Sequence, residues 1–321
     1  MRAEPLQRSH DEIKPIIIGT RGSPLALWQA RHVQSLLIEK HGFADDVVQI
    51  EIFKTSGDKL KGSLAEFGGK GLFTKELEEA LLDGRIDIAV HSMKDVPTVS
   101  QKGLEIVSVL KREDPRDGFI SHKCDDLMDL PKGAVIGTAS LRRRAQLARL
   151  RPDVTFTLLR GNVGTRLEKL ARGDCDATFL AVAGLNRLGQ ADVITQNVPT
   201  EMMLSAPAQG AIGIEMASEN SRIYDLIKAL DHMPTRHAIT AERAFLAALD
   251  GSCRTPIAAL GTITEGHMHF RGELLSHDGQ TSFSRDVKIP LTPEMDIYKA
   301  AFEIGQEVRQ EAQGQITWDE V

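Results

Sequence analysis

One aspartate of this sequence is well placed to transfer protons. Asp95 lies just beyond Ile86–Val90, an apolar run that predicts a buried strand, and Lys94 precedes it. A carboxylate at the end of such a strand can donate or accept a proton, or stabilise a cation, when its surroundings tune its pKa. On position alone, an aspartate that pairs with Lys94 or caps a turn explains the residue equally well.

Arginines are concentrated between residues 141 and 172. This stretch has nine Lys and Arg residues against two Asp and Glu, a local charge of +7 in a chain whose formal net charge is −6. Eight of the nine cations are arginine. The planar guanidinium pairs bidentately with carboxylates or phosphates, so these are the ligand groups that the cluster suits. A solvated basic helix face is the alternative.

The overall composition argues against several classes of protein. A net charge of −6 is not that of a general binder of nucleic acid or of anionic membranes. No apolar run approaches the roughly 20 residues that span a bilayer, and the polar first fifteen residues do not resemble a secretory signal. Three widely spaced cysteines suit neither a disulfide framework nor a metal cluster. We therefore expect a cytoplasmic protein without a metal ion.

Cys253 is the cysteine most suited to reactivity. It lies in the predicted loop Asp250–Pro256 beside Arg254, whose charge would favour the thiolate. Cys124 and Cys175 are expected to be structural.

The elements that must position these residues alternate between strands and helices. Ile16–Ile18 predicts a strand, followed by a glycine turn in which Ser23 is the expected N-cap of a helix. The backbone amides of this turn, with Arg21, would suit an anion, although a plain capping turn explains the same residues. The plan recurs later, with Ser140 as the expected N-cap of a helix at Leu141–Leu150. We predict two α/β lobes of similar plan, each with parallel strands, and ligands at the carboxyl ends of those strands.

The remaining segments complete the prediction. A helix at Thr235–Leu249, three short strands and a final helix at 292–313 indicate a small α+β domain. The glycine-rich run Phe67–Phe73 lacks the spacing of a nucleotide-binding loop, so we interpret it as a lid or cleft rim. His91 is expected to be a buried histidine bonded to backbone rather than a base.

Six strings in this sequence occur in the order found in the porphobilinogen deaminase (hydroxymethylbilane synthase) family, which the chain resembles from about Ile16 to its end. They are Gly19–Ala26, Gly68–Glu78, Asp87–Pro97, Ile136–Arg143, Leu159–Leu167 and Leu180–Leu188. Two positions depart from the family pattern, because Ser252 and Ala208 stand where glycine is usual.

The resemblance implies a transferase of tetrapyrrole (haem and porphyrin) biosynthesis. In that family, four porphobilinogen molecules are joined head to tail with release of ammonia, and hydrolysis then frees linear hydroxymethylbilane. The growing chain is held on a dipyrromethane cofactor, which a thioether attaches to a cysteine that matches Cys253. The catalytic aspartate of the family matches Asp95.

The resemblance also implies a set of binding residues. Those expected to bind the cofactor, besides Cys253, are Lys94, Ser140, Arg142, Arg143 and Arg160. Those expected to bind the substrate are Arg21, Ser23, Lys70, Phe73, Arg166 and Arg187. Each pyrrole carries an acetate and a propionate, so a bound oligopyrrole is a polyanion that needs several cations.

The implied fold is α/β, with two lobes like those of type II periplasmic binding proteins and a small α+β C-terminal domain that carries the cofactor cysteine. The expected domains are residues 14–112 plus 211–230, residues 113–210, and residues 231–321. We expect a monomer whose partner is the small molecule porphobilinogen, with no nucleic acid and no membrane. A non-catalytic binder of a small organic anion is the alternative, which the absence of a signal sequence and the presence of Cys253 disfavour. A basic nucleic-acid module has only the arginines in its favour.

Overall fold

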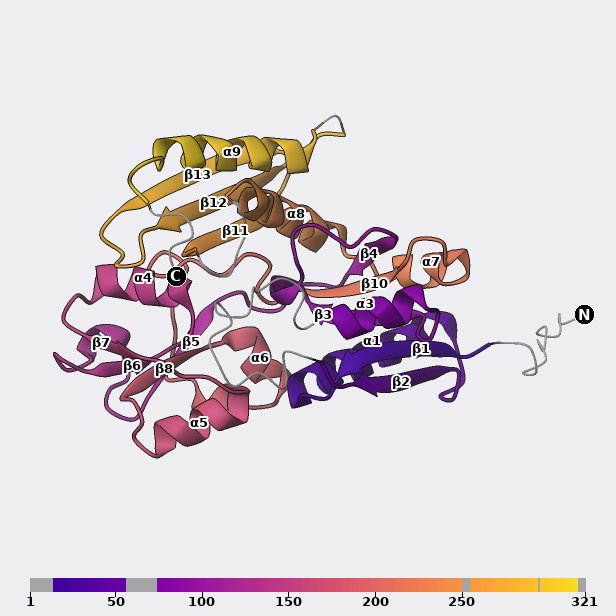
Figure 1. Cartoon of the computed structure of the whole chain (residues 1–321), viewed down its shortest axis with the longest axis horizontal. Helices are drawn as coiled ribbons and strands as arrows, with labels where there is room; N and C mark the ends of the chain where they lie inside the picture. The colour runs from indigo at the N-terminus through magenta and orange to yellow at the C-terminus, as the bar shows by residue number, and fades with distance from the viewer. Residues whose placement is uncertain (1–13, 56–73, 250–254, 294, 317–321) are drawn as a thin grey trace, which may run out of the picture.

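The computed structural model describes residues 14–55, 74–249, 255–293 and 295–316. These residues form two α/β lobes and a smaller α+β unit, and the lobes lie side by side below the α+β unit in Figure 1. The predicted fold class is confirmed. Within these ranges, no helix is both long and apolar enough to cross a membrane.

The first lobe is built on a sheet with the strand order β2-β1-β3-β10-β4. Its strands are β1 (Ile16–Arg21), β2 (Val48–Phe53), β3 (Ile88–Ser92), β4 (Leu104–Val109) and β10 (Ile212–Ala217). Its helices are α1 (Pro24–His41), α3 (Lys75–Leu82) and α7 (Ser221–Lys228). As predicted, Ser23 caps α1, because its hydroxyl accepts a hydrogen bond from the Ala26 N–H at 3.3 Å.

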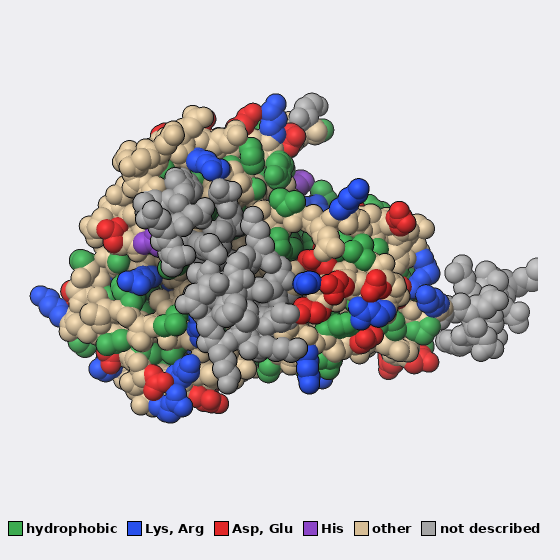
Figure 2. Space-filling view, in the orientation of Figure 1, with side chains coloured by type: hydrophobic (Ala, Val, Ile, Leu, Met, Phe, Trp, Pro, Cys, Tyr) green, Lys and Arg blue, Asp and Glu red, His purple; other side chains and the backbone are tan. Residues whose placement is uncertain are grey.

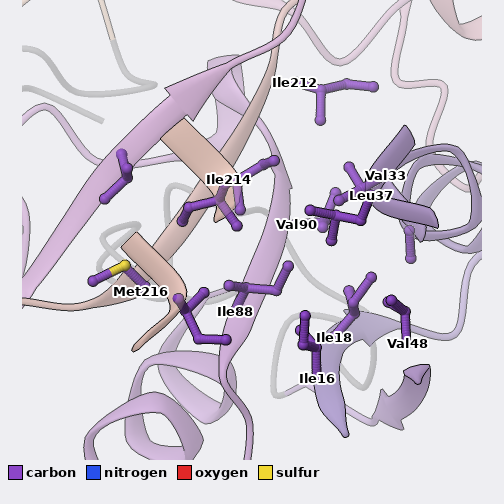
Figure 3. Packing of buried hydrophobic residues seen from close by; sticks show 14 of the residues in the cluster. Ile16, Ile18, Val33, Leu37, Val48, Ile88, Val90, Ile212, Ile214 and Met216 are labelled. Atoms are coloured by element: carbon purple, nitrogen blue, oxygen red, sulfur yellow. The ribbon is translucent and has the colours of Figure 1, made fainter. Parts of the chain in front are cut away.

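Apolar side chains on the face of this sheet that α1 covers form one buried cluster. Ile18 of β1, Val33 of α1 and Ile214 of β10 are each 0% exposed and belong to one cluster, which Figure 3 shows between α1 and the strands. Burying each such side chain stabilises the lobe by about 1.5–3 kcal/mol. The cluster therefore holds β1 and β3 in a fixed register, with their polar ends projecting beyond the core.

The second lobe repeats this plan with the strand order β7-β6-β8-β5-β9. Its strands are β5 (Asp117–Ser121), β6 (Val135–Gly137), β7 (Thr155–Thr157), β8 (Ala177–Ala181) and β9 (Gln196–Asn197). Its helices are α4 (Leu141–Leu150), α5 (Val163–Ala171) and α6 (Val182–Arg187). The expected N-cap of α4 is confirmed, because the Ser140 hydroxyl accepts from the Arg143 N–H at 3.3 Å.

The two lobes share a hydrogen bond that ties the start of one strand to its neighbour. Asp87, which precedes β3, accepts the Ile17 N–H at 2.9 Å, and Asp176, which precedes β8, accepts the Val135 N–H at 2.7 Å. Each carboxylate thus ties the start of its own strand to the neighbouring parallel strand. The Gly-x-x-Asp pattern at residues 84–87 and 173–176 therefore has the same structural role in both lobes.

The prediction of parallel strands is confirmed for β1, β2 and β3 in the first lobe and for β6, β7 and β8 in the second. Two strands that were not predicted, β10 and β5, run the other way. β10 runs antiparallel to β3 and β4, and β5 runs antiparallel to β8 and β9. The physical reason is the route of the chain, because β5 and β10 each follow a crossing from the other lobe. Each begins opposite the carboxyl end of a parallel strand, at Ala181 and Ser92 respectively, and must therefore run the other way.

The second crossing, residues 198–211 between β9 and β10, contains an unusual backbone conformation. Ala208 has a φ of 60°, the one positive φ outside glycine among the described residues. A side chain in this left-handed region costs roughly 1–2 kcal/mol. The position is one where the family pattern has glycine, so the sequence departure coincides with a strained residue.

The α+β unit consists of a three-stranded sheet and two helices packed on one of its faces (Figure 1). Its elements are α8 (Met233–Ala248), β11 (Ile257–Thr264), β12 (His267–Leu275), β13 (Ser282–Pro290) and α9 (Ile297–Glu311). Phe245 of α8 and Phe270 of β12 meet edge to face in its core, 5.5 Å apart. The predicted strands are confirmed, whereas the last helix begins later than expected, with Asp296 as its N-cap.

Candidate active site

Asp95 and Lys94 lie on a short 3₁₀ turn, η3 (Met93–Asp95), that follows β3 directly. The turn is anchored from below by Met93, whose N–H donates to the Ala211 carbonyl at 3.0 Å. The Met93 side chain is 2% exposed and packs against Gly213, where a Cβ would come within 2.1 Å of its sulfur. With Met93 buried, the two residues that follow it are directed away from the core, and both are exposed.

A small pocket in the first lobe adjoins Asp95. Its polar lining consists of Arg21, Ser23, Gln29, Thr74, His91, Ser92 and Asp95. Gln29 of α1 donates to the Ser92 hydroxyl at 2.8 Å, which fixes the wall between α1 and β3. The structure thus brings together three residues predicted separately from the sequence, Arg21, Ser23 and Asp95.

Thr74 is a lining residue that sequence reasoning missed. It is 2% exposed, and among the described residues its hydroxyl oxygen has no hydrogen-bond partner. Although Thr74 precedes α3, its side chain does not cap that helix. A buried hydroxyl without a partner is costly, so a ligand in the pocket is the natural acceptor or donor for it.

One arginine of the second lobe, Arg166, interacts electrostatically with Asp95. Arg166 lies on α5, where its Nε donates to the Gly161 carbonyl at 2.8 Å. Burial, together with the charges of Arg143 and Arg160, lowers the pKa of Arg166 to about 10, and the Asp95 carboxylate opposes this shift. The carboxylate of Asp95 on the first lobe and the guanidinium of Arg166 on the second are therefore close enough for their charges to interact.

Lys94 interacts electrostatically with Asp95 and with the arginines of the second lobe. Desolvation lowers the pKa of Lys94, and the positive charges of Arg143 and Arg166 lower it further. The carboxylates of Asp95 and Asp117 oppose the shift. Its ammonium also lies 3.5 Å from the Gln209 side-chain carbonyl. Lys94 therefore shares its surroundings with both Asp95 and the arginines.

Arg142 and Arg143 are held by a carboxylate that the sequence analysis did not identify. Asp117 is fully buried and accepts from Arg142 Nη2 at 2.7 Å and from Arg143 Nη2 at 2.6 Å. Burial alone would raise the pKa of Asp117, but the charges of Arg142 and Arg143 and the hydrogen bonds from Arg143 and Gln209 hold it well below its ordinary value. The signal was an acidic residue at the start of a strand, directly after the crossing between lobes.

Because they already donate to Asp117, Arg142 and Arg143 have fewer N–H groups left to bind a ligand. Arg142 and Arg143 are 5% and 6% exposed, and they also donate to the Leu204 and Phe179 carbonyls at 2.6 and 2.7 Å. The Nε of Arg142 is buried without a partner among the described residues. Arg160 and Arg166 are more accessible than this buried pair.

Arg187 has a different setting from the other arginines. It lies at the end of α6, donates to the Gly210 carbonyl at 2.7 Å, and places its guanidinium 5.8 Å from the ring centre of Trp28 on α1. Burial lowers its pKa to about 10 against the opposing charge of Glu113. Its described contacts therefore join the two lobes beside the second crossing.

His91 is buried as expected, but its predicted backbone partner is wrong. Its Nε2 lies 3.0 Å from a carboxylate oxygen of Glu215 on β10, and both side chains are at most 5% exposed. The partner could not be anticipated because β10 enters the sheet from a distant part of the sequence. Cys253, Lys70 and Phe73, also predicted as site residues, lie outside the described residues.

On the face drawn in Figure 2, acidic and basic side chains are interspersed over both lobes. No group of three or more metal-ligating side chains occurs within the described ranges. Fold and site together define a two-lobed α/β protein with an acid on one lobe and a set of arginines on the other.

Comparisons with known proteins identify the family. The model for "Porphobilinogen deaminase, dipyromethane cofactor binding domain" matches residues 16–225, and that for the porphobilinogen deaminase C-terminal domain matches residues 237–314. The porphobilinogen deaminase of Paracoccus denitrificans is 52% identical over 270 residues, covering 84% of this chain and 86% of that protein. That of Nitrobacter hamburgensis is 51% identical over 267 residues, covering 83% and 84%. The chain belongs to the porphobilinogen deaminase family.

Solved structures give a more distant likeness. The methionine-binding protein MetQ has a TM-score of 0.44 and 12% identity, covering 68% of this chain and 90% of its own. A periplasmic substrate-binding protein of an ABC transporter from Coxiella burnetii has a TM-score of 0.42 and 14% identity, covering 68% and 93%.

Proposed function

We propose that this protein joins four porphobilinogen molecules head to tail, releasing ammonia at each step, and then frees hydroxymethylbilane by hydrolysis. The observation that carries the proposal is the electrostatic coupling of Asp95 on one lobe to Arg166 on the other. A proton donor is thereby placed opposite cations that suit the acetate and propionate groups of pyrroles. Membership of the porphobilinogen deaminase family gives the substrate its chemical identity.

The residues present fit a covalently attached dipyrromethane cofactor. Its carboxylates would meet Lys94, Ser140, Arg142, Arg143 and Arg160, and the buried, unpartnered Nε of Arg142 is one donor that such a group could use. We place the thioether on Cys253, on the strength of the sequence pattern alone. When bound, the cofactor supplies a permanent anchor for the growing chain, so that no intermediate is lost between cycles.

Six residues are proposed to bind the incoming substrate. Arg21 and Ser23 are supported by their place in the pocket that adjoins Asp95, and Arg166 by its coupling to that residue. Arg187 is supported by its position between the lobes. Lys70 and Phe73 rest on the sequence resemblance.

Asp95 performs the acid–base steps in this proposal. Its carboxyl group gives a proton to the aminomethyl nitrogen of porphobilinogen, and ammonia departs with the carbon–nitrogen electron pair. The resulting Asp95 carboxylate stabilises the positive charge left on the pyrrole. After the new carbon–carbon bond forms, the same carboxylate takes the pyrrole proton and is ready for the next cycle.

We propose that the chain has three domains. The first domain comprises residues 14–112 and 211–230, the second residues 113–210, and the third residues 231–321. The pairing of β10 with β3 and β4 supports assigning the return segment to the first domain. We propose that the protein acts as a monomer in the cytoplasm.

Two measurements test the function. The intact mass of the denatured protein should exceed the sequence mass by two pyrrole units, and a Cys253→Ser variant should lack the adduct. The wild-type protein should release ammonia from porphobilinogen, whereas Asp95→Asn should retain the fold and lose nearly all turnover. An unmodified wild-type mass together with no ammonia release would leave the non-catalytic anion binder as the better explanation.

A further inference from the structure

An arginine of the α+β unit holds the turn that carries Lys94 and Asp95. Arg243 on α8 donates from Nη1 to the Val96 carbonyl at 2.9 Å and to the Met93 carbonyl at 3.4 Å. Its Nη2 donates to the Pro97 carbonyl at 2.6 Å. One side chain therefore satisfies three backbone carbonyls on both sides of Asp95.

The turn has little else to fix its position on this side. As a single 3₁₀ turn it has one weak internal hydrogen bond, from the Val96 N–H to the Met93 carbonyl at 3.3 Å. Its other anchor, Met93 against Ala211 and Gly213, lies on the sheet side. Short 3₁₀ segments with poor internal geometry depend on such outside contacts.

The surroundings of Arg243 make it a fixed cation. Burial lowers its pKa, while the nearby carboxylate of Glu215 opposes this shift. Glu215 is itself held by His91, which lies three residues before Lys94 at the end of β3. Arg243 thus sits between the turn and a buried carboxylate of the first lobe, and it does not line the pocket beside Asp95.

We propose that Arg243 is a positioning residue for catalysis: by holding the 93–97 backbone from the α+β unit, it sets the place of the Asp95 carboxyl group relative to the substrate. The proposal rests on the proposed function of Asp95. A displacement of about 1 Å in a catalytic group can lower the rate on the order of 100-fold. Arg243 would act through the turn, without contact with the substrate.

The sequence offers a matched control on the same helix. Arg236 of α8 also reaches across to backbone carbonyls of the first lobe, those of Ile106 and Val107 on β4, and it pairs with Asp231. Its loss removes a comparable set of contacts between α8 and the lobe, and Asp231 keeps Lys228 as its ion-pair partner. It leaves the contacts of the 93–97 backbone with Arg243 intact.

The test compares steady-state kinetics and thermal stability of Arg243→Met, Arg243→Lys and Arg236→Met, with kcat expressed per cofactor-loaded protein from intact mass. We expect Arg243→Met to lower kcat by about 10- to 100-fold with KM within about twofold of wild type. Arg243→Lys, which can still reach part of the carbonyl set, should recover some of that loss and carries the test if the Met variant does not fold. Arg236→Met should keep kcat close to wild type even though its melting temperature falls.

An unchanged kcat in both Arg243 variants, or an equal loss in Arg236→Met, would overturn the proposal by reducing Arg243 to a stabilising contact. Failure of the proposed function has a different signature. In that case the wild-type protein itself would release no ammonia from porphobilinogen.

Discussion

Arg112 and Glu242 are joined by two hydrogen bonds, of 2.5 and 3.0 Å, at the point where the three parts of the chain meet. Glu242 is 0% exposed, and it also accepts the N–H groups of Ala208 and Gly261 at 2.6 and 2.8 Å. One carboxylate of α8 thereby contacts Arg112 in the first crossing (residues 110–116, between β4 and β5), the strained Ala208 of the second, and Gly261 of β11.

Replacing this carboxylate should destabilise the whole chain. Removing one partner of a buried ion pair leaves an uncompensated charge, at a cost of about 3–5 kcal/mol. We expect Glu242→Gln to lower the free energy of unfolding by about this much in urea denaturation. Glu311→Gln, which removes an exposed partner of Arg285, is the control and should change it far less. Similar losses in both variants would contradict a special role for Glu242.

Asp117 should make stability depend on acid. Its folded-state pKa lies below the ordinary value of 3.8, so its contribution is fully present above about pH 4 and is lost as the pH falls toward the folded-state pKa. Asp117→Asn should be less stable than wild type at pH 7, and the difference should shrink in unfolding measurements taken at successively lower pH. A difference that is constant down to pH 2 would show that the charge of Asp117 is not what stabilises the pair of arginines.

The buried and the accessible arginines should respond differently to truncation. Arg142→Leu leaves Asp117 with Arg143 as its remaining charged partner and should lower the free energy of unfolding by about 1.5–3 kcal/mol, the worth of a hydrogen bond to a charged group, with poor cofactor loading. Arg166→Leu should change stability by less than about 1 kcal/mol and raise KM for porphobilinogen on the order of tenfold. Unfolding curves and kinetics on the two variants check this. A large stability loss in Arg166→Leu would instead make that residue part of the framework.

Thr74 should show opposite effects on stability and affinity. Thr74→Val keeps the shape but removes a buried hydroxyl without a described partner, so it should leave stability unchanged or raise it by about 1 kcal/mol. If the substrate uses this hydroxyl, KM should rise severalfold. Ser205→Ala removes another buried hydroxyl that has no hydrogen-bond partner within the described ranges and does not line the pocket. It should match the stability effect without the change in KM, and an unchanged KM in Thr74→Val would exclude the contact.

Local sequence signals predicted the starts of α1 and α4 correctly. The capping roles of Ser23 and Ser140 depend on residues three positions away. Such features need no knowledge of the path of the chain, because the interacting atoms are close in the sequence.

The partners that were missed are distant in sequence. Asp117 is 26 residues from Arg143, Glu215 is 124 from His91, and Glu242 is 130 from Arg112. Each meets its partner only after the crossings have placed β5, β10 and α8. The same crossings bring β5 and β10 into the sheets antiparallel to their neighbours, and neither strand was predicted from the sequence. The role of Cys253 stays a prediction from the sequence.

The insertion of β10 between β3 and β4 has a consequence for the order of events during synthesis. The sheet of the first lobe cannot be completed until residue 217 has emerged from the ribosome, whereas every strand of the second sheet lies between residues 117 and 197. The second lobe can therefore finish folding first. Until β10 emerges, the edges of β3 and β4 that later pair with it are unpaired, and the nascent chain is most exposed to mispairing during this interval.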